Sequence, residues 1–254
     1  RSQAVCGGFR LPLGRGSTPP LGRALDRATG MARIALLAMR WAAGLRAHQN
    51  GDIDAARADY SAVIDDQPGF APGLHFRARL EWDAGALEAA ARDLASALDA
   101  APGYAEARVD ASRLALELQQ PGAAIALANA GLARDPAHLG LLRALGHALL
   151  RLGDGAAAAD AFHRSSMLQP LDAETQYNLG VALQLAGDPA AAAQAYRHAN
   201  AFDPAFVDAT FNLAVLLQHE GRAKSAAEMY LQVVARDPTR DAAFKNLCEV
   251  LREE

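Results

Sequence analysis

Three asparagines recur in the C-terminal part of the chain at a constant spacing. Asn178, Asn212 and Asn246 are separated by 34 residues each. Each side-chain amide offers hydrogen-bond donors and an acceptor, so a column of such amides can pair with the main chain of an extended peptide. We therefore expect these residues to hold a peptide backbone without distinguishing its side chains.

No arrangement of residues predicts a reaction. Gly14-Arg15-Gly16 and Gly153-Asp154-Gly155 lack the later glycine and the preceding strand of a phosphate loop. Acidic pairs such as Asp65-Asp66 are interpreted as solvated charges near helix ends. The histidines are dispersed, none has a metal-binding spacing such as HExxH, and each is expected on the surface or in a groove. They are His48, His75, His138, His147, His163, His198 and His219. We predict no catalytic residue, no metal, no cofactor and no enzymatic activity.

The elements that would position the asparagines are delimited by a proline that returns at a fixed period. The prolines, 34 residues apart, are Pro68, Pro102, Pro136, Pro170, Pro204 and Pro238. Proline cannot continue a helix, and the residue before it is disfavoured in the helical region. The period predicts a stacked array of repeats. They cover 37–70, 71–104, 105–138, 139–172, 173–206 and 207–240.

Each repeat carries the same internal marks. A small residue holds the eighth place, where two helices must lie close: Gly44, Ala78, Ser112, Gly146, Gly180 and Ala214. The twentieth place is alanine throughout: Ala56, Ala90, Ala124, Ala158, Ala192 and Ala226. The twenty-fourth place is bulky in five repeats, with Tyr60, Leu94, Phe162, Tyr196 and Tyr230, and is Ala128 in the third. Glycine at the fifteenth place divides five repeats into two helices of about a dozen residues. These glycines are Gly51, Gly85, Gly153, Gly187 and Gly221.

This pattern resembles the tetratricopeptide repeat family, whose helix-turn-helix unit has the same length and the same marks. The resemblance covers 37–240. It implies an all-α, right-handed superhelical solenoid of antiparallel helix pairs. The aromatic expected at the fourth place of each repeat is absent. The third repeat departs most, because Pro121 lies near the start of its second helix and Gly131 inside it. We expect a local distortion there and an array that continues through it.

In this family the first helices of successive repeats line a concave groove, so the resemblance implies a protein or peptide ligand there. Besides the three asparagines, the implied lining comprises Tyr177, Phe211, Arg79, Arg113, Arg143, His147, Arg151, Gln184 and Gln218. Arginine forks suit carboxylates, and Trp82 with the two aromatics supplies apolar walls. An acidic extended segment is therefore the expected guest.

Two alternatives compete with this interpretation of the groove. The arginines could instead pair with acidic residues of the same region, namely Glu106, Asp110, Glu117 and Glu174. Asparagine is also a common consensus choice in tetratricopeptide repeats. A similar asparagine ladder occurs in the superhelical repeat region of O-linked N-acetylglucosamine transferases. The resemblance thus implies a protein-interaction scaffold or, alternatively, the substrate-recruiting arm of a larger enzyme such as a glycosyltransferase.

Composition indicates a helical protein with neither a membrane nor a nucleic-acid partner. The formal net charge is −4 and the pI about 6.0, which gives no reason to expect nucleic acid. The apolar run 34–39 is too short for a signal core or a membrane span. Cys6 and Cys248 lie at opposite ends and predict no disulfide framework. We therefore expect a cytoplasmic protein.

The two ends of the chain differ from the repeats. Residues 1–30 carry a formal charge of +4, are rich in glycine and proline, and are predicted to be a disordered basic leader before a helix that opens at Met31. Residues 241–254 restart the repeat, as a capping helix or the start of a seventh unit. Its apolar residues at helical spacing are expected to cover the preceding repeat. They are Phe244, Leu247, Cys248 and Leu251. Self-association through terminal helices is a further expectation.

Overall fold

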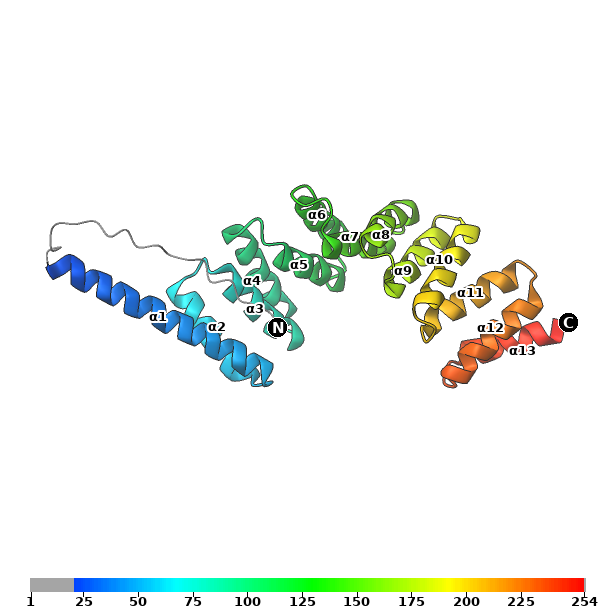
Figure 1. Ribbon diagram of the computed structural model, residues 1–254, viewed down its shortest axis with the longest axis horizontal. Helices are drawn as coiled ribbons and strands as arrows, with labels where there is room; N and C mark the ends of the chain where they lie inside the picture. The colour runs from blue at the N-terminus through cyan, green and yellow to red at the C-terminus, as the bar shows by residue number, and fades with distance from the viewer. Residues whose placement is uncertain (1–20, 254) are drawn as a thin grey trace. The chain divides into compact units, whose positions relative to one another are not determined.

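The computed structural model describes residues 21–253, and every regular element within that range is an α-helix (Figure 1). Packing divides the chain into two compact units, Arg1–Asp66 and Gln67–Glu254. The boundary between the two units falls four residues before the end of the first predicted repeat, 37–70. Within residues 21–253, no helix is both long enough and apolar enough to cross a membrane.

The first unit is an antiparallel pair formed by α1 (Leu21–Gln49) and α2 (Ile53–Asp66). The ring of Tyr60 is fully buried, and a Cβ added to Gly44 would lie 2.8 Å from it. At the other end of the pair, Arg33 forms an ion pair with Asp66 at 2.6 Å. The contacts of Gly44 and Arg33 therefore fix the two helices side by side.

Helix α1 corrects the expected boundary of the leader. It begins at Leu21, so residues 21–30 are helical and not disordered, whereas the rest of the predicted leader lies outside the described residues. From Leu21 the sequence has no proline before Pro68 and is rich in alanine, leucine and arginine, which are strong helix formers. The prediction missed the start of this helix because the composition was averaged over residues 1–30.

The second unit stacks the remaining helices so that each packs against the next along the chain. The first helices of the repeats are α3 (Ala71–Asp83), α5 (Ala105–Glu117), α7 (Leu139–Leu152), α9 (Ala173–Leu185) and α11 (Val207–His219). The second helices are α4 (Leu87–Ala100), α6 (Pro121–Leu132), α8 (Gly155–Leu168), α10 (Pro189–Phe202) and α12 (Ala223–Arg236). Helix α13 (Asp241–Glu253) follows. The result is an all-α array of antiparallel helix pairs.

The core of each repeat is built around the alanine at its twentieth place, and all six of these alanines are fully buried. The eighth and twenty-fourth places meet inside a repeat. A Cβ on Gly146 would lie 2.6 Å from the ring of Phe162, and one on Gly180 would lie 2.5 Å from the ring of Tyr196. Glycine at the eighth place therefore makes room for an aromatic ring, which is a size match that fixes how the two helices of a repeat approach.

The turn between the two helices of a repeat needs a left-handed residue at the fifteenth place. All five glycines there have φ between 70° and 86°. The third repeat holds Gln119 at this place with φ 58°, and it is the one non-glycine residue with positive φ in the described chain. A residue other than glycine in this left-handed backbone conformation lowers the stability of the fold by about 1–3 kcal/mol. The expected distortion of the third repeat thus lies partly in its turn.

Helix α6 carries the rest of the distortion. It has 12 residues, against 14 in each of the other second helices. Pro121 opens the helix, where its missing N–H costs nothing. Gly131 is buried, and a Cβ there would lie 2.4 Å from Leu141 and 2.7 Å from Arg108. This glycine therefore permits close packing, and the array continues through the third repeat.

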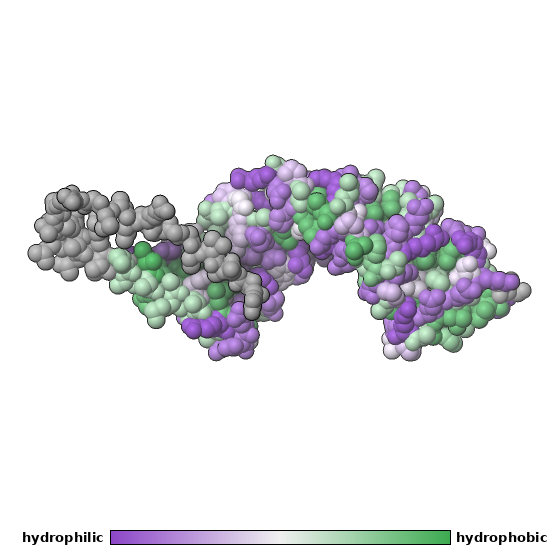
Figure 2. Space-filling view, viewed as in Figure 1, coloured by the Kyte–Doolittle hydropathy of each residue, from purple (hydrophilic) through white to green (hydrophobic). Residues whose placement is uncertain are grey.

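Helix α13 packs against α12 with a face that shares only Leu247 with the one expected, because Phe244, Cys248 and Leu251 are exposed. Its buried residues are Ala243, Leu247 and Val250, which belong to the core that also contains Tyr230. Phe244 and Leu251 are 59% and 54% exposed, and hydrophobic residues are visible at this end of the chain in Figure 2. Self-association through this exposed surface stays a prediction.

Candidate functional site

A hollow of about 610 Å³ opens on the face formed by the first helices α5, α7 and α9. We call it the first-helix hollow. Its walls carry Arg113, Arg143, His147 and Arg151, which are four of the five basic residues proposed from sequence, together with Glu117 and Glu174. Val109, Leu116 and Leu150 supply apolar lining. The predicted Arg79 is exposed on α3 and is not part of this hollow.

The arginines of the hollow are partly engaged by the protein itself. Arg143 forms an ion pair with Asp172 at 2.5 Å and also donates to Gln169 at 2.9 Å. Arg151 donates to Gln119 at 2.7 Å. The pairing alternative is thus realised, but mostly with residues other than the four acids named from sequence. Among residues 21–253, the buried Nε of Arg143 is left without a hydrogen-bond partner.

Arg113 is the least engaged of these cations. Its side chain is 65% exposed, and its nearest carboxylate oxygen, on Asp110, is 3.9 Å away. The guanidinium lies 5.9 Å from the ring centroid of Trp82. The indole nitrogen of Trp82 donates to Glu117 at 2.8 Å. Trp82 therefore orients both the carboxylate of Glu117 and the guanidinium of Arg113 on this face.

His147 contributes a neutral imidazole to the hollow. Burial lowers the pKa of His147, Arg113 and Arg143 lower it further, and Glu174 acts in the opposite direction. Its ring also meets Phe162 edge-on, with the ring centroids 5.2 Å apart. At neutral pH this side chain offers one donor and one acceptor to a ligand, and no positive charge.

Two of the three asparagines are tied to tyrosines. The side-chain nitrogen of Asn246 donates to the Tyr230 hydroxyl at 3.0 Å, and that hydroxyl donates to Gln218 at 2.7 Å. One repeat earlier, Asn212 lies 3.5 Å from the Tyr196 hydroxyl, which donates to Gln184 at 3.0 Å. The predicted groove residues Gln184 and Gln218 thus belong to a relay that recurs with the repeat.

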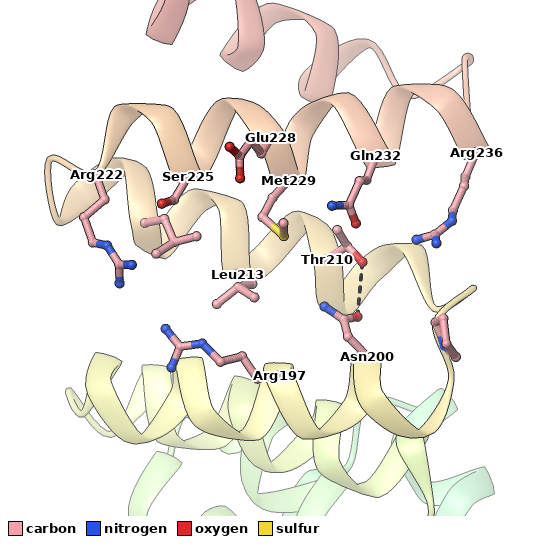
Figure 3. A pocket seen from close by; sticks show the side chains of 12 residues that line it. Arg197, Asn200, Thr210, Leu213, Arg222, Ser225, Glu228, Met229, Gln232 and Arg236 are labelled. Carbon is pink, nitrogen blue, oxygen red and sulfur yellow. Dashed lines mark hydrogen bonds between the residues drawn. The ribbon is translucent and has the colours of Figure 1, made fainter.

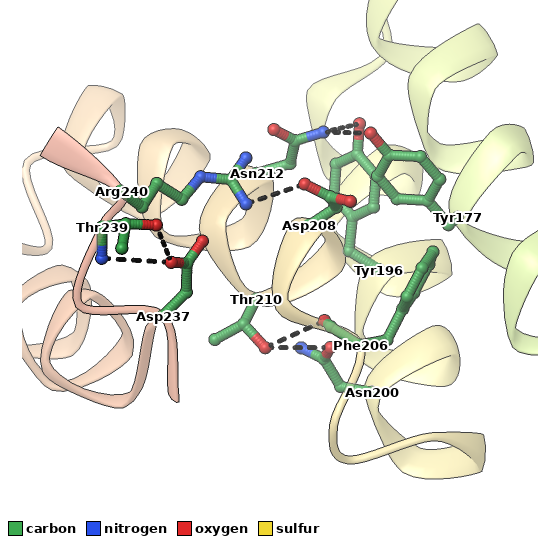
Figure 4. Close-up of polar contacts among 10 residues, drawn as sticks. All are labelled: Tyr177, Tyr196, Asn200, Phe206, Asp208, Thr210, Asn212, Asp237, Thr239 and Arg240. Carbon is green, nitrogen blue, oxygen red and sulfur yellow. Dashed lines mark hydrogen bonds and ion pairs between the residues drawn. The ribbon is translucent and has the colours of Figure 1, made fainter. Parts of the chain in front are cut away.

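Burial raises the pKa of Tyr196 and of Tyr230, so both phenols stay protonated and can donate to their glutamines. Asn212 also approaches the hydroxyl of Tyr177 at 3.4 Å, as Figure 4 shows. The sequence contained the signal for this relay, because Gln, Tyr and Asn recur together at the repeat spacing.

Asn178 is the exception. Phe162 stands where the relay would need a tyrosine, and within residues 21–253 the Asn178 side chain makes no hydrogen bond. Asn178 is half-buried on α9, the helix that also brings Glu174 to the first-helix hollow. Of the three predicted asparagines, this one keeps its whole amide available.

The two predicted aromatic walls are half-buried and held by neighbours. The Tyr177 ring meets Phe206 edge-on at a centroid distance of 5.0 Å. The guanidinium of Arg240 lies 4.3 Å from the ring centroid of Phe211. It also pairs with Asp208 at 2.7 Å, a contact drawn in Figure 4. Arg240 was not predicted, because it stands two residues after the last repeat proline in a turn.

His75 corrects the expectation that each histidine lies on the surface or in the groove. It is 4% exposed, with one ring nitrogen 2.9 Å from the Tyr104 hydroxyl and the other 2.8 Å from Asp110. Burial raises the pKa of Tyr104, and Glu106 and Asp110 add to the effect, so the phenol is a poor nucleophile. The cluster joins the second and third repeats. Among the side chains that the structure describes, no group of three or more His, Cys, Asp or Glu could hold a metal ion.

Comparisons with known proteins agree with this architecture. One family model, described as Tetratricopeptide repeat, matches residues 42–105 and 143–205, and another with the same description matches 183–251. No curated protein matches the chain. Because the matched segments span more than half of the sequence, they identify the family directly.

Solved structures show the same fold at low sequence identity. YrrB, described as a TPR protein with an unusual peptide-binding site, is 21% identical with a TM-score of 0.63, over 74% of this chain and 96% of YrrB. PilW, a type IV pilus biogenesis factor, is 19% identical with a TM-score of 0.72, over 84% and 98%. PilF of Pseudomonas aeruginosa is 16% identical with a TM-score of 0.72, over 86% and 99%. The chain belongs to the tetratricopeptide repeat family.

Proposed function

We propose that this chain is a protein-interaction scaffold that binds an extended segment of a partner protein along the first helices of its second unit. The observation that carries the proposal is the first-helix hollow, which collects polar and apolar groups from α5, α7 and α9 on one face. Proteins of this repeat family bind protein or peptide partners, and the printed description of YrrB names a peptide-binding site for that protein. The proposal assigns no reaction and no cofactor to the chain.

The chemistry of the hollow suits a main chain with one side chain inserted. Asn178 can donate to and accept from a peptide group, because its side chain is half-buried and makes no hydrogen bond among the described residues. Val109, Leu116 and Leu150 can contact an apolar side chain. Asn178 does not itself line the hollow but lies one helical turn after Glu174, which does. The peptide backbone would therefore pair with Asn178 next to the hollow, and the inserted side chain would supply buried area inside it.

The acidic character of the guest rests on Arg113. The other two arginines already face Asp172 or Gln119, and Glu117 and Glu174 offset part of the positive charge. An acidic residue of the partner would therefore lie beside Arg113, near Trp82. Three expectations from the sequence stay predictions. They are the likeness of the asparagine column to that of O-linked N-acetylglucosamine transferases, the link to a larger enzyme, and the cytoplasmic location.

Peptides selected against the full chain from a random display library test this proposal. Asn178→Ala should weaken the selected peptides about two- to tenfold, because a net hydrogen bond is worth roughly 0.5–1.5 kcal/mol. Arg113→Ala should weaken acidic peptides most and reduce the salt dependence of binding. The control is Asn129→Ala, which changes an exposed asparagine on the second helix α6. Equal losses in Asn129→Ala and Asn178→Ala would remove the first-helix face from consideration.

A further inference from the structure

A second hollow lies on the opposite face of the array, between the second helices α10 and α12, with α11 as its floor (Figure 3). Its volume is about 400 Å³. Thr210, Leu213 and Leu217 of α11 form the floor and are between 2% and 5% exposed. Asn212, which faces the tyrosine relay, is two residues from Thr210 and therefore points to the other side of the same helix. This second-helix hollow is thus separate from the first-helix hollow.

Positive charge dominates the rim of the second-helix hollow. Arg197, Arg222 and Arg236 line it against the single acid Glu228. Within residues 21–253, Arg197 and Arg236 form no ion pair, and Arg222 reaches only Glu220, at 3.6 Å with both side chains largely exposed. In the first-helix hollow Arg143 and Arg151 have partners at 2.5 and 2.7 Å, and only Arg113 lacks a close one. The second-helix hollow therefore offers more unengaged arginines to an anion.

Arg222 stands at a place where three of the six repeats have a capping aspartate and two others, with Ala86 and Gln120, have no side-chain cap. It precedes α12 at the N-cap, where the equivalent residues Asp154 and Asp188 accept hydrogen bonds from the first turns of α8 and α10 at 3.0 and 2.9 Å. Arg222 makes no such cap, and its charge opposes the positive end of the helix dipole. A bound carboxylate at this end would satisfy both the guanidinium and the helix.

The interior of the hollow adds donors and an apolar surface. Thr210 donates to the side-chain oxygen of Asn200 at 3.1 Å, which turns the Asn200 nitrogen toward the opening (Figure 3). Met229 and Leu213 lie beside it. The hollow therefore presents guanidinium and amide donors around a hydrophobic centre, and one acid among them.

We propose that the second-helix hollow binds an extended acidic segment of a protein partner, at a site additional to the first-helix face. Figure 3 shows Arg197 and Arg222 at one end of the hollow and Arg236 at the other. Arg222 and Arg236 are separated by the length of α12, about 21 Å at a rise of 1.5 Å per residue. An extended chain covers this distance in about six residues. The segment therefore carries acidic residues about six positions apart, with an apolar residue between them over Met229.

Labelled synthetic peptides and the full chain test the proposal by fluorescence anisotropy. The peptides place two glutamates at spacings between about two and eight residues around a central leucine, and each has a glutamine twin. Binding should be tightest near a spacing of six, and the glutamine twin should bind at least about tenfold more weakly. No binding up to about 1 mM, or affinity that ignores the spacing, would contradict the proposal.

Two pairs of substitutions with the same change in net charge locate the binding. Arg197→Gln with Arg236→Gln should weaken the best peptide about tenfold or more. Arg92→Gln with Arg134→Gln removes two exposed arginines elsewhere in the second unit and should leave its affinity within about twofold. Equal losses in both pairs would show a diffuse charge effect and overturn the site.

Two further measurements separate this site from the alternatives. A display-selected peptide of the first-helix face should not displace the labelled acidic peptide, whereas full displacement would place the acidic peptide in the first-helix hollow and contradict the second site. A single-stranded oligonucleotide that binds more tightly than the peptide and is lost in the Arg197→Gln, Arg236→Gln variant would assign the site to nucleic acid. Failure here leaves the first-helix proposal standing, because the two faces share none of the substituted residues.

Discussion

The side-chain nitrogen of Asn246 lies 3.0 Å from the hydroxyl oxygen of Tyr230, so a phenol in the sixth repeat holds the helix that follows it. The same relation joins Tyr196 to Asn212 one repeat earlier. It is missing at Asn178, because Phe162 has no hydroxyl. The difference between phenylalanine in the fourth repeat and tyrosine in the next two thus decides which asparagine amide is available to bind a ligand.

Phe162→Tyr should restore the contact between phenol and asparagine and withdraw Asn178 from the partner, although Leu150 stands where the relay has its glutamine. The new hydroxyl would lie at the place held by Tyr196 in the next repeat, where it can accept from Asn178 as Tyr196 does from Asn212. Selected peptides should then bind about two- to fivefold more weakly, while thermal stability changes little. Titration of the same peptide against wild type and variant is the measurement, and unchanged affinity would show that Asn178 does not contact the peptide.

Gln119→Gly should raise stability by about 0.5–1 kcal/mol. The left-handed φ of 58° strains glutamine, and the lost bond to Arg151 is an exposed one that contributes little. The matched reverse change is Gly187→Gln, where φ is 84° and the space around an added Cβ is open. It should cost about 1 kcal/mol from the backbone alone. Urea unfolding measures both, and a destabilised Gln119→Gly variant would contradict the strain.

Ala192→Leu should destabilise the fifth repeat by about 1–3 kcal/mol, because Ala192 is fully buried and the added atoms overpack its helix contact. Ala190 is exposed two residues away on α10, so Ala190→Leu should leave the melting temperature nearly unchanged. Equal shifts in thermal melting for the two variants would place the repeat register in error.

His147 should make the chain less stable as the pH falls below about 6.5. Its pKa in the folded protein lies below the ordinary value of 6.5, because burial disfavours the imidazolium. Below 6.5 the unfolded chain therefore takes up the proton first, and stability is lost until the pH passes the folded pKa. The free energy of unfolding measured across this pH range should fall less in His147→Gln than in wild type. It should fall as much as in wild type in His163→Gln, which changes an exposed histidine. Identical pH profiles for His147→Gln and wild type would assign the decline to other groups.

The sequence predicted the repeat, its helices and their tight contacts, because each depends on local rules. Proline, the turn glycine and the buried alanine act within one repeat, and the structure places Ala56 and its five equivalents in the core. The leader boundary was misplaced at Met31, since the helix-forming composition from Leu21 was averaged with the segment before it. The exposed side of α13 was misjudged because helical spacing alone does not say which of two apolar stripes packs.

The candidate site was predicted in part. The repeat positions that face a ligand in this family identified Arg113, Arg143, His147 and Arg151, and these four residues line one hollow. Side-chain pairing could not be foreseen, because Arg143 reaches Asp172 in the turn before the next repeat and Asn246 reaches back to a phenol. The second-helix hollow was missed because Arg197, Arg222 and Arg236 stand at places that the groove pattern does not include.

Photo-crosslinking tests the central claim most directly. A display-selected peptide carrying one benzoylphenylalanine is irradiated in complex with the full chain, and the linked residues are mapped by mass spectrometry. The account predicts links to α5, α7 and α9, at apolar residues of the first-helix hollow such as Leu116 and Leu150. Links confined to the second helices α4, α6 and α8 would contradict it.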